Sequence, residues 1–181
     1  MNNIFLTGFM ATGKTVVGQA LARRLGWRFV DLDGEIEREA GMNVAQIFSR
    51  FGEGEFRSRE REAVERCCRL RSAVVATGGG AVVDPRSRAA MRAAGSLVCL
   101  SADMGTLLAR LGSCTDRPLL VGAAGRAEKM RSLLAERAAA YADVDWTVDT
   151  SARTPAEVAG MIAKWVAERG AAGRAAKAPA G

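Results

Sequence analysis

The stretch Gly8-Phe9-Met10-Ala11-Thr12-Gly13-Lys14-Thr15 decides the fold of this chain. It matches the pattern Gly-x-x-x-x-Gly-Lys-Ser/Thr, in which glycines let successive backbone N–H groups converge on phosphate oxygens. The apolar run at residues 4–6 predicts a short buried strand before it. A helix is predicted after it, because apolar residues recur at helical spacing (Val17, Ala20, Leu21 and Leu25). These flanking elements favour a nucleotide-phosphate site over the alternative, a chance turn.

Phosphate chemistry explains the residue types in this loop. The N-terminal end of the following helix is positive and attracts anions. Lys14 adds a point charge suited to the β- and γ-phosphates, and the Thr15 hydroxyl can bind Mg²⁺. The sequence therefore predicts binding of a nucleoside triphosphate together with Mg²⁺.

Length and composition predict one soluble globular domain. The chain has 181 residues, of which 49% are hydrophobic and 25% are charged. No apolar run approaches the roughly 18 residues of a membrane span, so we expect no membrane partner. The chain begins with a strand and without a basic leader, so we expect a cytoplasmic protein.

The formal net charge is +6. Three explanations of this charge are open: a bias in composition, the binding of anionic ligands, or the binding of nucleic acid. No basic helix face carries interleaved aromatic residues, so we expect no nucleic-acid partner. The four cysteines show no Cys-x-x-Cys spacing, and the chain has no histidine. Any general base must therefore be a carboxylate or a lysine.

Strand-like runs alternate with helical patterns along the chain. The runs lie at residues 4–7, 28–30, 73–76, 97–100 and 146–148. This alternation predicts an α/β fold with three layers, α/β/α, and a five-stranded parallel sheet. The last helix is expected to begin at Pro155, with Thr154 as its N-cap.

Three further segments complete the predicted organisation of a single domain at residues 1–169. Residues 33–72 read as helix and are too long for a simple crossover, which suggests a small subdomain, with a substrate-binding lobe at about residues 33–60. Residues 112–124 are Gly-rich around a central Arg117, as in a mobile lid. Residues 170–181 contain little but Ala, Gly, Pro and cations, so we expect a disordered tail.

Two carboxylates follow the second predicted strand. In an open parallel sheet, ligands bind beyond the carboxyl ends of the strands, so Asp31 and Asp33 should lie near the phosphates. One could order Mg²⁺ and the other could accept a proton from a substrate hydroxyl. The alternative is that Asp33 caps the helix that follows.

Glycines and arginines supply the remaining candidates. Gly78, Gly79 and Gly80 follow the third strand, where they permit a close approach of backbone to ligand. Arg57 stands beside Phe56, and Glu60, three residues on, could orient its guanidinium. Taken alone, each arginine could equally be a solvated surface charge.

The ordered set of motifs resembles the shikimate kinase family. It comprises the phosphate loop, Asp31-Leu-Asp33, Gly52-Glu…Phe56-Arg57, Gly78-Gly-Gly80, Arg117-Pro-Leu-Leu120 and Arg137-Ala-Ala-Ala-Tyr141. The resemblance covers about residues 3–168, and the ordered set is far more specific than any single member of it. It implies a P-loop kinase fold with a helical substrate lobe and a lid.

The resemblance also implies a role for each matching residue. The implied catalytic residues are Lys14, Asp33 and Arg117. The implied ATP-binding residues are Gly8, Ala11, Thr12, Gly13, Lys14, Thr15, Val16, Arg110, Arg117 and Arg153. The implied shikimate-binding residues are Asp33, Phe48, Phe56, Arg57, Gly78, Gly79, Gly80 and Arg137. The implied Mg²⁺-binding residues are Thr15 and Asp31.

The activity implied by the resemblance is ATP-dependent phosphorylation of the 3-hydroxyl of shikimate by a monomer, a step of aromatic amino acid synthesis. Two alternatives stay open: a kinase of another small polyol acid such as gluconate, and a nucleotide-binding module without turnover. The chain departs from the family pattern at two loop positions. Ala11 stands where many members have Gly, and Val16 where many have a second hydroxyl residue.

Overall fold

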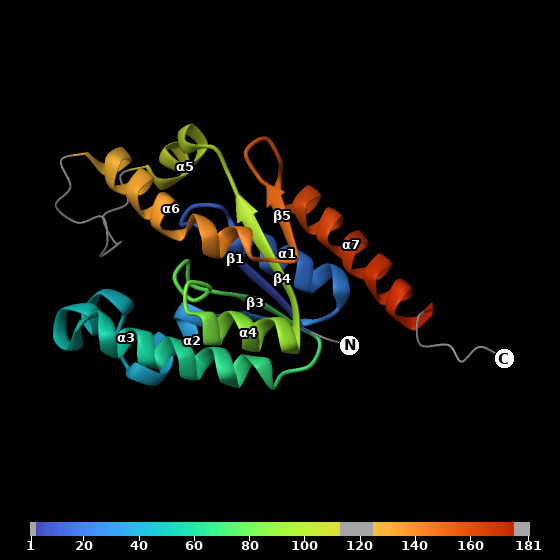
Figure 1. The fold of residues 1–181 in the computed structure, drawn as a ribbon, viewed down its shortest axis with the longest axis horizontal. Helices are drawn as coiled ribbons and strands as arrows, with labels where there is room; N and C mark the ends of the chain where they lie inside the picture. Colours follow the sequence, from blue (N-terminus) through green and yellow to red (C-terminus); the bar gives the residue numbers. More distant parts are fainter. Residues whose placement is uncertain (1–2, 113–124, 176–181) are drawn as a thin grey trace.

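The computed structural model describes residues 3–112 and 125–175. Its described strands form one five-stranded parallel sheet in the order β2-β3-β1-β4-β5, which runs through the middle of the molecule (Figure 1). The strands are β1 (Asn3–Gly8), β2 (Arg28–Asp31), β3 (Ala73–Ala76), β4 (Gly95–Ser101) and β5 (Trp146–Asp149). The predicted α/β class, the parallel sheet and the positions of its strands are therefore confirmed.

Strand β1 is the centre of the sheet and is buried along its whole length. It pairs with β3 on one side, where Phe5 lies opposite Val75, and with β4 on the other, where Phe5 lies opposite Leu97. A strand in this position is buried on both faces, which explains its continuous apolar run.

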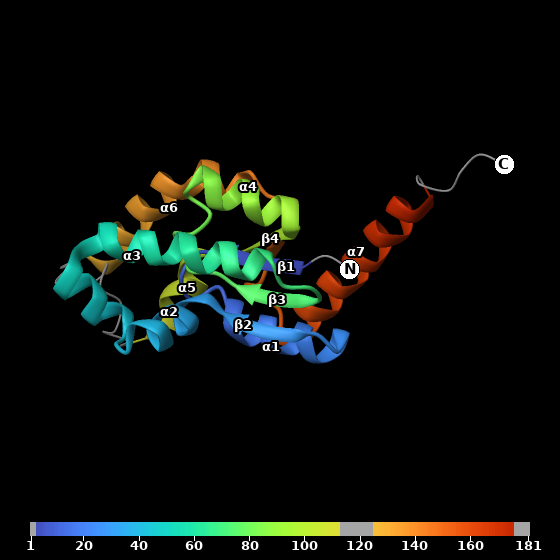
Figure 2. The same cartoon turned by 90° about the horizontal axis from the view of Figure 1, so that it is seen from below.

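Helices cover both faces of the sheet (Figure 2). Helices α1 and α7 pack together on one face, and α3, α4 and α6 lie over the other. The helices are α1 (Lys14–Leu25), α2 (Leu32–Ala40), α3 (Val44–Cys68), α4 (Pro85–Ala94), α5 (Met104–Leu111), α6 (Arg126–Ala142) and α7 (Pro155–Ala175).

Side chains that alternate along β1 divide the core between the two faces. Phe5 belongs to a cluster with Ile36, Val64 and Met91, from the helices α2, α3 and α4. Ile4 belongs to a second cluster, which includes Leu21 of α1 and Ile162 of α7. A third cluster gathers where the phosphate loop meets the helices α5 and α6; it contains Phe9, Met10, Leu107, Leu111, Met130 and Leu133.

Helix boundaries follow local chemistry. Helix α7 begins at Pro155, as predicted, and Thr154 and Glu157 bond each other's backbone N–H groups as a capping box. Helices α2 and α3 fill most of the interval between β2 and β3, and Gly52, at φ 80°, interrupts α3.

Helix α7 continues to Ala175, into the segment expected as a disordered tail from residue 170, and disorder of that tail stays a prediction. Alanine has the highest helix propensity, which favours extension of the helix without apolar anchors. Residues 176–181, and the predicted lid apart from Gly112, lie outside the described residues.

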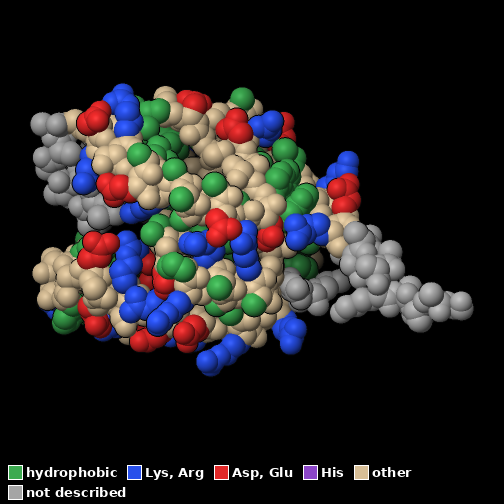
Figure 3. All heavy atoms as spheres, in the orientation of Figure 1, with side chains coloured by type: hydrophobic (Ala, Val, Ile, Leu, Met, Phe, Trp, Pro, Cys, Tyr) green, Lys and Arg blue, Asp and Glu red, His purple; other side chains and the backbone are tan. Residues whose placement is uncertain are grey.

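The described surface mixes charges of both signs. On the face shown in Figure 3, Lys and Arg side chains are interspersed with Asp and Glu. Among the described residues, no helix combines the length and the apolar character needed to span a bilayer.

We expect Asn3→Ala to destabilise the fold strongly. Asn3 is 1% exposed. Its amide donates to the carbonyls of Cys67 and Leu70 at 3.4 and 2.8 Å and accepts from Ala73 N–H at 3.2 Å. Loss of these bonds leaves buried backbone groups unsatisfied, so the free energy of unfolding should fall by about 2–4 kcal/mol. Urea denaturation measures this quantity.

Asn43→Ala is the matched control. Asn43 is the exposed N-cap of α3, and its loss should cost only about 1 kcal/mol. Equal effects of the two substitutions would show that the Asn3 contacts add nothing beyond an ordinary cap.

Candidate active site

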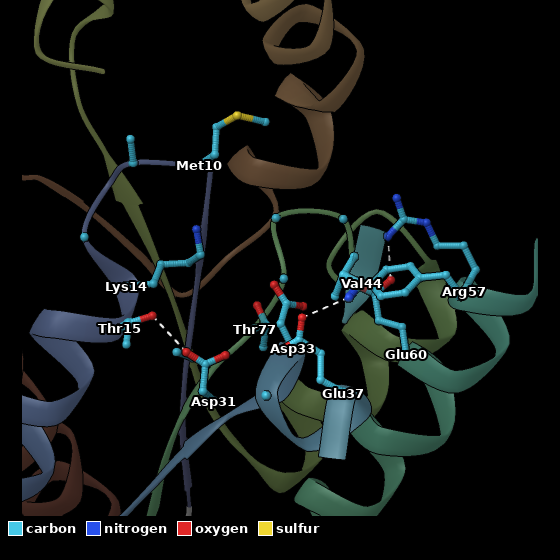
Figure 4. A pocket seen from close by; sticks show the side chains of 18 of the residues that line it. Met10, Lys14, Thr15, Asp31, Asp33, Glu37, Val44, Arg57, Glu60 and Thr77 are labelled. Atoms are coloured by element: carbon cyan, nitrogen blue, oxygen red, sulfur yellow. Dashed lines mark hydrogen bonds and ion pairs between the residues drawn. The ribbon is translucent and has the colours of Figure 1, made fainter. Parts of the chain in front are cut away.

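A cavity of about 620 Å³ opens where the carboxyl ends of β1, β2 and β3 meet. The start of α1, both helices between β2 and β3, and α6 complete its wall. Figure 4 shows Lys14, Thr15 and Asp31 at one end, Arg57 and Glu60 at the other, and Asp33 between them.

The phosphate loop at residues 8–15 has the backbone that its glycines predict. Gly8 and Gly13 have φ values of 130° and 92°, which disfavour residues with a Cβ. A Cβ on Gly8 would also lie 2.1 Å from the carbonyl oxygen of Leu100. The Thr12 hydroxyl donates to the carbonyl of Phe9 at 2.8 Å, which ties the loop to itself.

Lys14 and Thr15 face the cavity from the first turn of α1. Lys14 Nζ donates to the carbonyls of Gly8 and Phe9 at 2.9 and 2.8 Å. Thr15 Oγ1 donates to Asp31 Oδ2 at 2.9 Å, so a hydroxyl and a carboxylate from two elements meet at one point.

The pair of Thr15 and Asp31 fits a magnesium ion. Mg²⁺ prefers oxygen ligands and is usually bound by one or two protein groups together with phosphate oxygens and waters. The described residues contain no cluster of three potential metal ligands among Cys, Asp and Glu. This pair of oxygens beside the phosphate loop could hold Mg²⁺ together with the phosphates of a nucleotide.

Ala11 combines a side chain with a left-handed backbone. Its φ is 62°, and glycine is the residue that adopts this conformation without strain. The departure from the family pattern noted in the sequence therefore has a physical cost at this position.

Asp33 lies in the first turn of α2 and lines the cavity. The alternative that Asp33 caps this helix is wrong, because the helix begins at Leu32 and Asp31 occupies the N-cap position. A Cβ on Gly78 would lie 2.9 Å from Asp33 Oδ1 and 2.8 Å from Glu60 Oε1. Two carboxylates thus converge on the same glycine.

Arg57 is held by two glutamates of its own helix. Its Nη1 donates to Glu60 Oε2 at 2.7 Å, while Nε and Nη2 donate to Glu53 Oε1 at 3.2 and 3.0 Å. The Glu60 side chain is 5% exposed, whereas the Glu53 side chain is 57% exposed. Gly80 leaves room for this group, because a Cβ there would lie 2.3 Å from Arg57 Nη1 and the guanidinium would have to shift.

The environment of Glu60 opposes ionisation. Burial raises the pKa of Glu60, and the carboxylate of Asp33 raises it further. The guanidinium groups of Arg57 and Arg137 lower this pKa without cancelling the rise. The neighbouring cations therefore offset part of the effect of burial on the pKa of Glu60.

Helix α6 brings Arg137 and Tyr141 to the glycine turn after β3. Tyr141 Oη donates to the carbonyl of Gly79 at 2.7 Å. A Cβ on Gly79 would lie 3.3 Å from that hydroxyl oxygen and 3.5 Å from Arg137 Nη1. Burial raises the pKa of Tyr141, so the hydroxyl stays protonated and donates.

The aromatic pair predicted for the substrate lobe also reaches the cavity. The rings of Phe48 and Phe56 are 4.8 Å apart and tilted by 40°. Both line the wall, so this end of the cavity is apolar on one side and charged on the other.

Most of the predicted site residues share this one cavity. Those that line it are Ala11, Gly13, Lys14, Thr15, Val16, Asp31, Asp33, Phe48, Phe56, Arg57, Gly78, Gly79, Gly80 and Arg137. Gly8 and Thr12 belong to the loop but are not part of the wall. Arg117 lies outside the described residues.

Arg110 and Arg153 also lie outside the cavity wall. The guanidinium of Arg110 donates to the carbonyl and hydroxyl of Thr150, at 2.6 and 2.9 Å. Arg153 Nη1 donates to the carbonyl of Asp149 at 2.7 Å. Both therefore hold the turn after β5, and their contact with adenine stays a prediction.

Several wall residues were not predicted as site residues: Met10, Gly34, Glu37, Val44, Glu60, Ala76 and Thr77. Glu60 was predicted only to orient Arg57, which it does. Tyr141 was quoted in the sequence only as the last residue of the motif Arg137-Ala-Ala-Ala-Tyr141, one helical turn after Arg137, and no role was predicted for it.

A phosphate loop that faces arginines and carboxylates across one cavity, on this sheet topology, defines a P-loop kinase of small molecules. The family model for shikimate kinase matches residues 10–167. The chain belongs to the shikimate kinase family; it is an ATP-dependent kinase of the shikimate pathway, which supports aromatic amino acid synthesis.

Similarity to known proteins extends over nearly the whole chain. A shikimate kinase of Geobacter sulfurreducens is 45% identical over 166 residues, which cover 92% of this chain and 91% of the relative. The solved structure of a shikimate kinase from Acinetobacter baumannii in complex with shikimate is 34% identical. It matches with a TM-score of 0.89 and covers 93% of this chain and 94% of that one.

A gluconokinase from Sinorhizobium meliloti shares the fold. It matches with a TM-score of 0.58 at 17% identity and covers 92% of this chain and 94% of that one. This likeness concerns the architecture alone.

We expect Ala11→Gly to stabilise the protein. Relief of the left-handed strain outweighs the added freedom of glycine in the unfolded chain, so the free energy of unfolding should rise by about 0.5–1 kcal/mol. Urea denaturation shows whether the free energy of unfolding rises or falls in this variant.

Ala138→Gly is the control, since Ala138 is exposed within α6. There the same substitution should lower stability by about 1 kcal/mol. A fall in stability with both variants would contradict strain at Ala11.

Proposed function

We propose that the chain transfers the γ-phosphoryl group of ATP to the 3-hydroxyl of shikimate, which gives ADP and shikimate 3-phosphate. The observation that carries this proposal is a single cavity with the phosphate loop at one end, Arg57 at the other and Asp33 between; Arg137 also lines this cavity, close enough to Glu60 to lower its pKa. Shikimate is a small triol carboxylate, and the complementary groups are guanidiniums for its carboxylate and a carboxylate for its hydroxyls.

The phosphate end would bind ATP through the N–H groups of the loop and through Lys14. Lys14 Nζ would exchange its bonds to loop carbonyls for phosphate oxygens. Thr15 and Asp31 would hold Mg²⁺, which would neutralise charge on the phosphates when bound.

The far end would bind the carboxylate of shikimate. Guanidinium groups form charge-assisted and bidentate hydrogen bonds with carboxylates, which suits Arg57 and Arg137. The N–H of Gly79 would add a backbone donor, and Phe48 and Phe56 would contact the apolar face of the ring.

Asp33 would act as the general base. It would accept the proton of the 3-hydroxyl while that oxygen forms a bond to the γ-phosphorus and the bond to the β-phosphate oxygen breaks. The chain has no histidine, so a carboxylate is the natural acceptor. Phosphoryl transfer depends chiefly on positioning and positive charge, which Lys14 and Arg117 would supply.

The proposal also covers the setting of the enzyme. We propose a cytoplasmic monomer without a nucleic-acid or membrane partner, with Arg110 and Arg153 beside the adenine of ATP.

An assay of ADP release tests the reaction and the acceptor together. It compares a reaction that contains ATP, Mg²⁺ and shikimate with one in which gluconate replaces shikimate and with one that has no acceptor. Release that is equal with gluconate, or absent with every acceptor, would overturn the proposal.

We expect Arg57→Ala to weaken shikimate binding selectively. The variant loses one or two charge-assisted hydrogen bonds worth about 1.5–3 kcal/mol each, so the KM for shikimate should rise at least tenfold. The KM for ATP should hold, because Arg57 lies at the opposite end of the cavity. Steady-state kinetics with each substrate varied in turn measures both values.

Arg59→Ala is the matched control, since Arg59 pairs with Glu55 on the same helix. It should leave both KM values unchanged. An unaltered KM for shikimate in Arg57→Ala would remove Arg57 from the site.

We expect Asp33→Asn to lower kcat about a hundredfold or more, because the amide keeps the shape of the side chain but cannot accept the proton. Glu35→Gln is the control, since Glu35 lies on the same helical turn and pairs with Arg38. Single-turnover measurements isolate the chemical step. A kcat near that of the parent enzyme would exclude Asp33 as the base.

A further inference from the structure

Arg88 of α4 lies outside the cavity wall but bonds to two segments that reach the cavity. Its Nη1 donates to the carbonyl of Val82 at 2.6 Å, and its Nε donates to Asp143 Oδ2 at 2.7 Å. The Arg88 side chain is 19% exposed, so both bonds are partly shielded from water. Helices α4 and α6 lie side by side on one face of the sheet (Figures 1 and 2).

The first of these segments is the glycine turn after β3. It bends through bonds from Ala81 N–H to the carbonyl of Gly78, at 3.2 Å, and from Val83 N–H to that of Gly80, at 2.9 Å. Successive glycines are conformationally permissive, so such a turn needs contacts from outside to hold one shape. The bond from Arg88 holds the end of this turn at Val82, which is fully buried.

The second segment is the C-terminal end of α6. Asp143 is its C-cap residue, and the N–H of Asp143 bonds to the carbonyl of Ala139 at 3.1 Å. Within the last turns of this helix, Arg137 lines the cavity and Tyr141 bonds to the carbonyl of Gly79. The contacts form a closed ring: the glycine turn, Arg88, Asp143, the end of α6 and back to the turn through Tyr141.

We propose that Arg88 is a positioning residue for shikimate. It would fix the glycine turn relative to the end of α6. The N–H of Gly79 and the guanidinium of Arg137 would then lie at the spacing needed to bind the same carboxylate. This inference rests on the proposed roles of Gly79 and Arg137. It adds a residue on a third element that touches neither substrate.

Arg92 provides a matched control on the same helix. Its Nη1 lies 2.7 Å from Asp143 Oδ1, so it shares the acceptor of Arg88. The Arg92 side chain is 39% exposed, and no bond joins it to the glycine turn among the contacts described. A comparison of variants at the two arginines separates the effect of the hydrogen bond from Arg88 to Val82 from the effect of a surface ion pair with Asp143.

The test measures kcat and both KM values for Arg88→Ala, Arg88→Lys and Arg92→Ala in the full chain. We expect Arg88→Ala to raise the KM for shikimate five- to tenfold and to change the KM for ATP less than twofold. Arg88→Lys keeps the charge and one contact, so its KM for shikimate should rise two- to threefold. Arg92→Ala should stay within twofold for both substrates.

Urea denaturation of the same variants separates positioning from stability. A purely structural role lowers the folded fraction, and with it the apparent kcat, but leaves the KM for shikimate unchanged. That result for Arg88→Ala would overturn the proposal, and so would equal rises in Arg88→Ala and Arg92→Ala. If Arg88→Ala does not fold, Arg88→Lys decides by its own KM for shikimate.

Arg137→Ala serves as the reference for the proposed function. A raised KM for shikimate in Arg137→Ala with an unchanged KM in Arg88→Ala would contradict the positioning role of Arg88 and support the proposed substrate site. Unchanged values in both variants would defeat the assignment of the carboxylate site itself.

Discussion

The parallel pairing of β1 with β3 on one side and β4 on the other is the constraint on which the site depends. It brings the phosphate loop after β1 next to the glycine turn after β3, because parallel strands end at the same edge. The approach is so close that a Cβ on Gly79 would lie 3.1 Å from the carbonyl oxygen of Gly8. Glycine at these strand ends therefore relieves close packing and also exposes backbone to a ligand.

Charge pairing is the second constraint. The far end of the cavity holds Glu60 and Arg57, with Asp33 and Arg137 close enough to act on Glu60, in a partly buried volume where an unpaired charge would be costly. The ion pair of Glu60 with Arg57 and the rise in the pKa of Glu60 caused by burial show the balance of these effects. Under the proposed function, a site that attracts a carboxylate thus contains carboxylates of its own, and Glu60 and Glu53 hold Arg57 in place.

The sequence predicted the architecture well, because the decisive signals are local. Buried apolar runs, the spacing of glycines around Lys14 and the cap at Thr154 each act within a few residues. Contacts between distant segments could not be read in this way. The bond from Tyr141 to Gly79 spans 62 positions, and that from Arg88 to Asp143 spans 55. Neither pair has a local pattern that marks it.

The tail expected from residue 170 shows a different limit of inference from composition. Composition from Gly170 onward lacks apolar anchors, which argues against packing, but a helix that has already started can extend through alanines at little cost. A segment that follows a long helix can therefore continue that helix even where it has no apolar face to bury. At Arg57, residue spacing allowed a surface charge and the ordered family motifs favoured a binding role; Arg57 lies in the cavity wall, and its contact with substrate stays a prediction.

Lys14 and Arg57, two of the cations that would meet the substrates under the proposed function, are already bonded within the protein, and this sets how selective they are. Lys14 bonds two loop carbonyls, and Arg57 bonds Glu60 and Glu53. The pair with exposed Glu53 is of a kind worth about 0–1 kcal/mol, so an incoming carboxylate can replace it at little cost. The bond to buried Glu60 is not exchangeable in this way, because its loss would leave a carboxylate without its cation. Arg57 can thus offer its exchangeable edge to a ligand while its buried edge stays fixed, which orients the guanidinium before any substrate arrives.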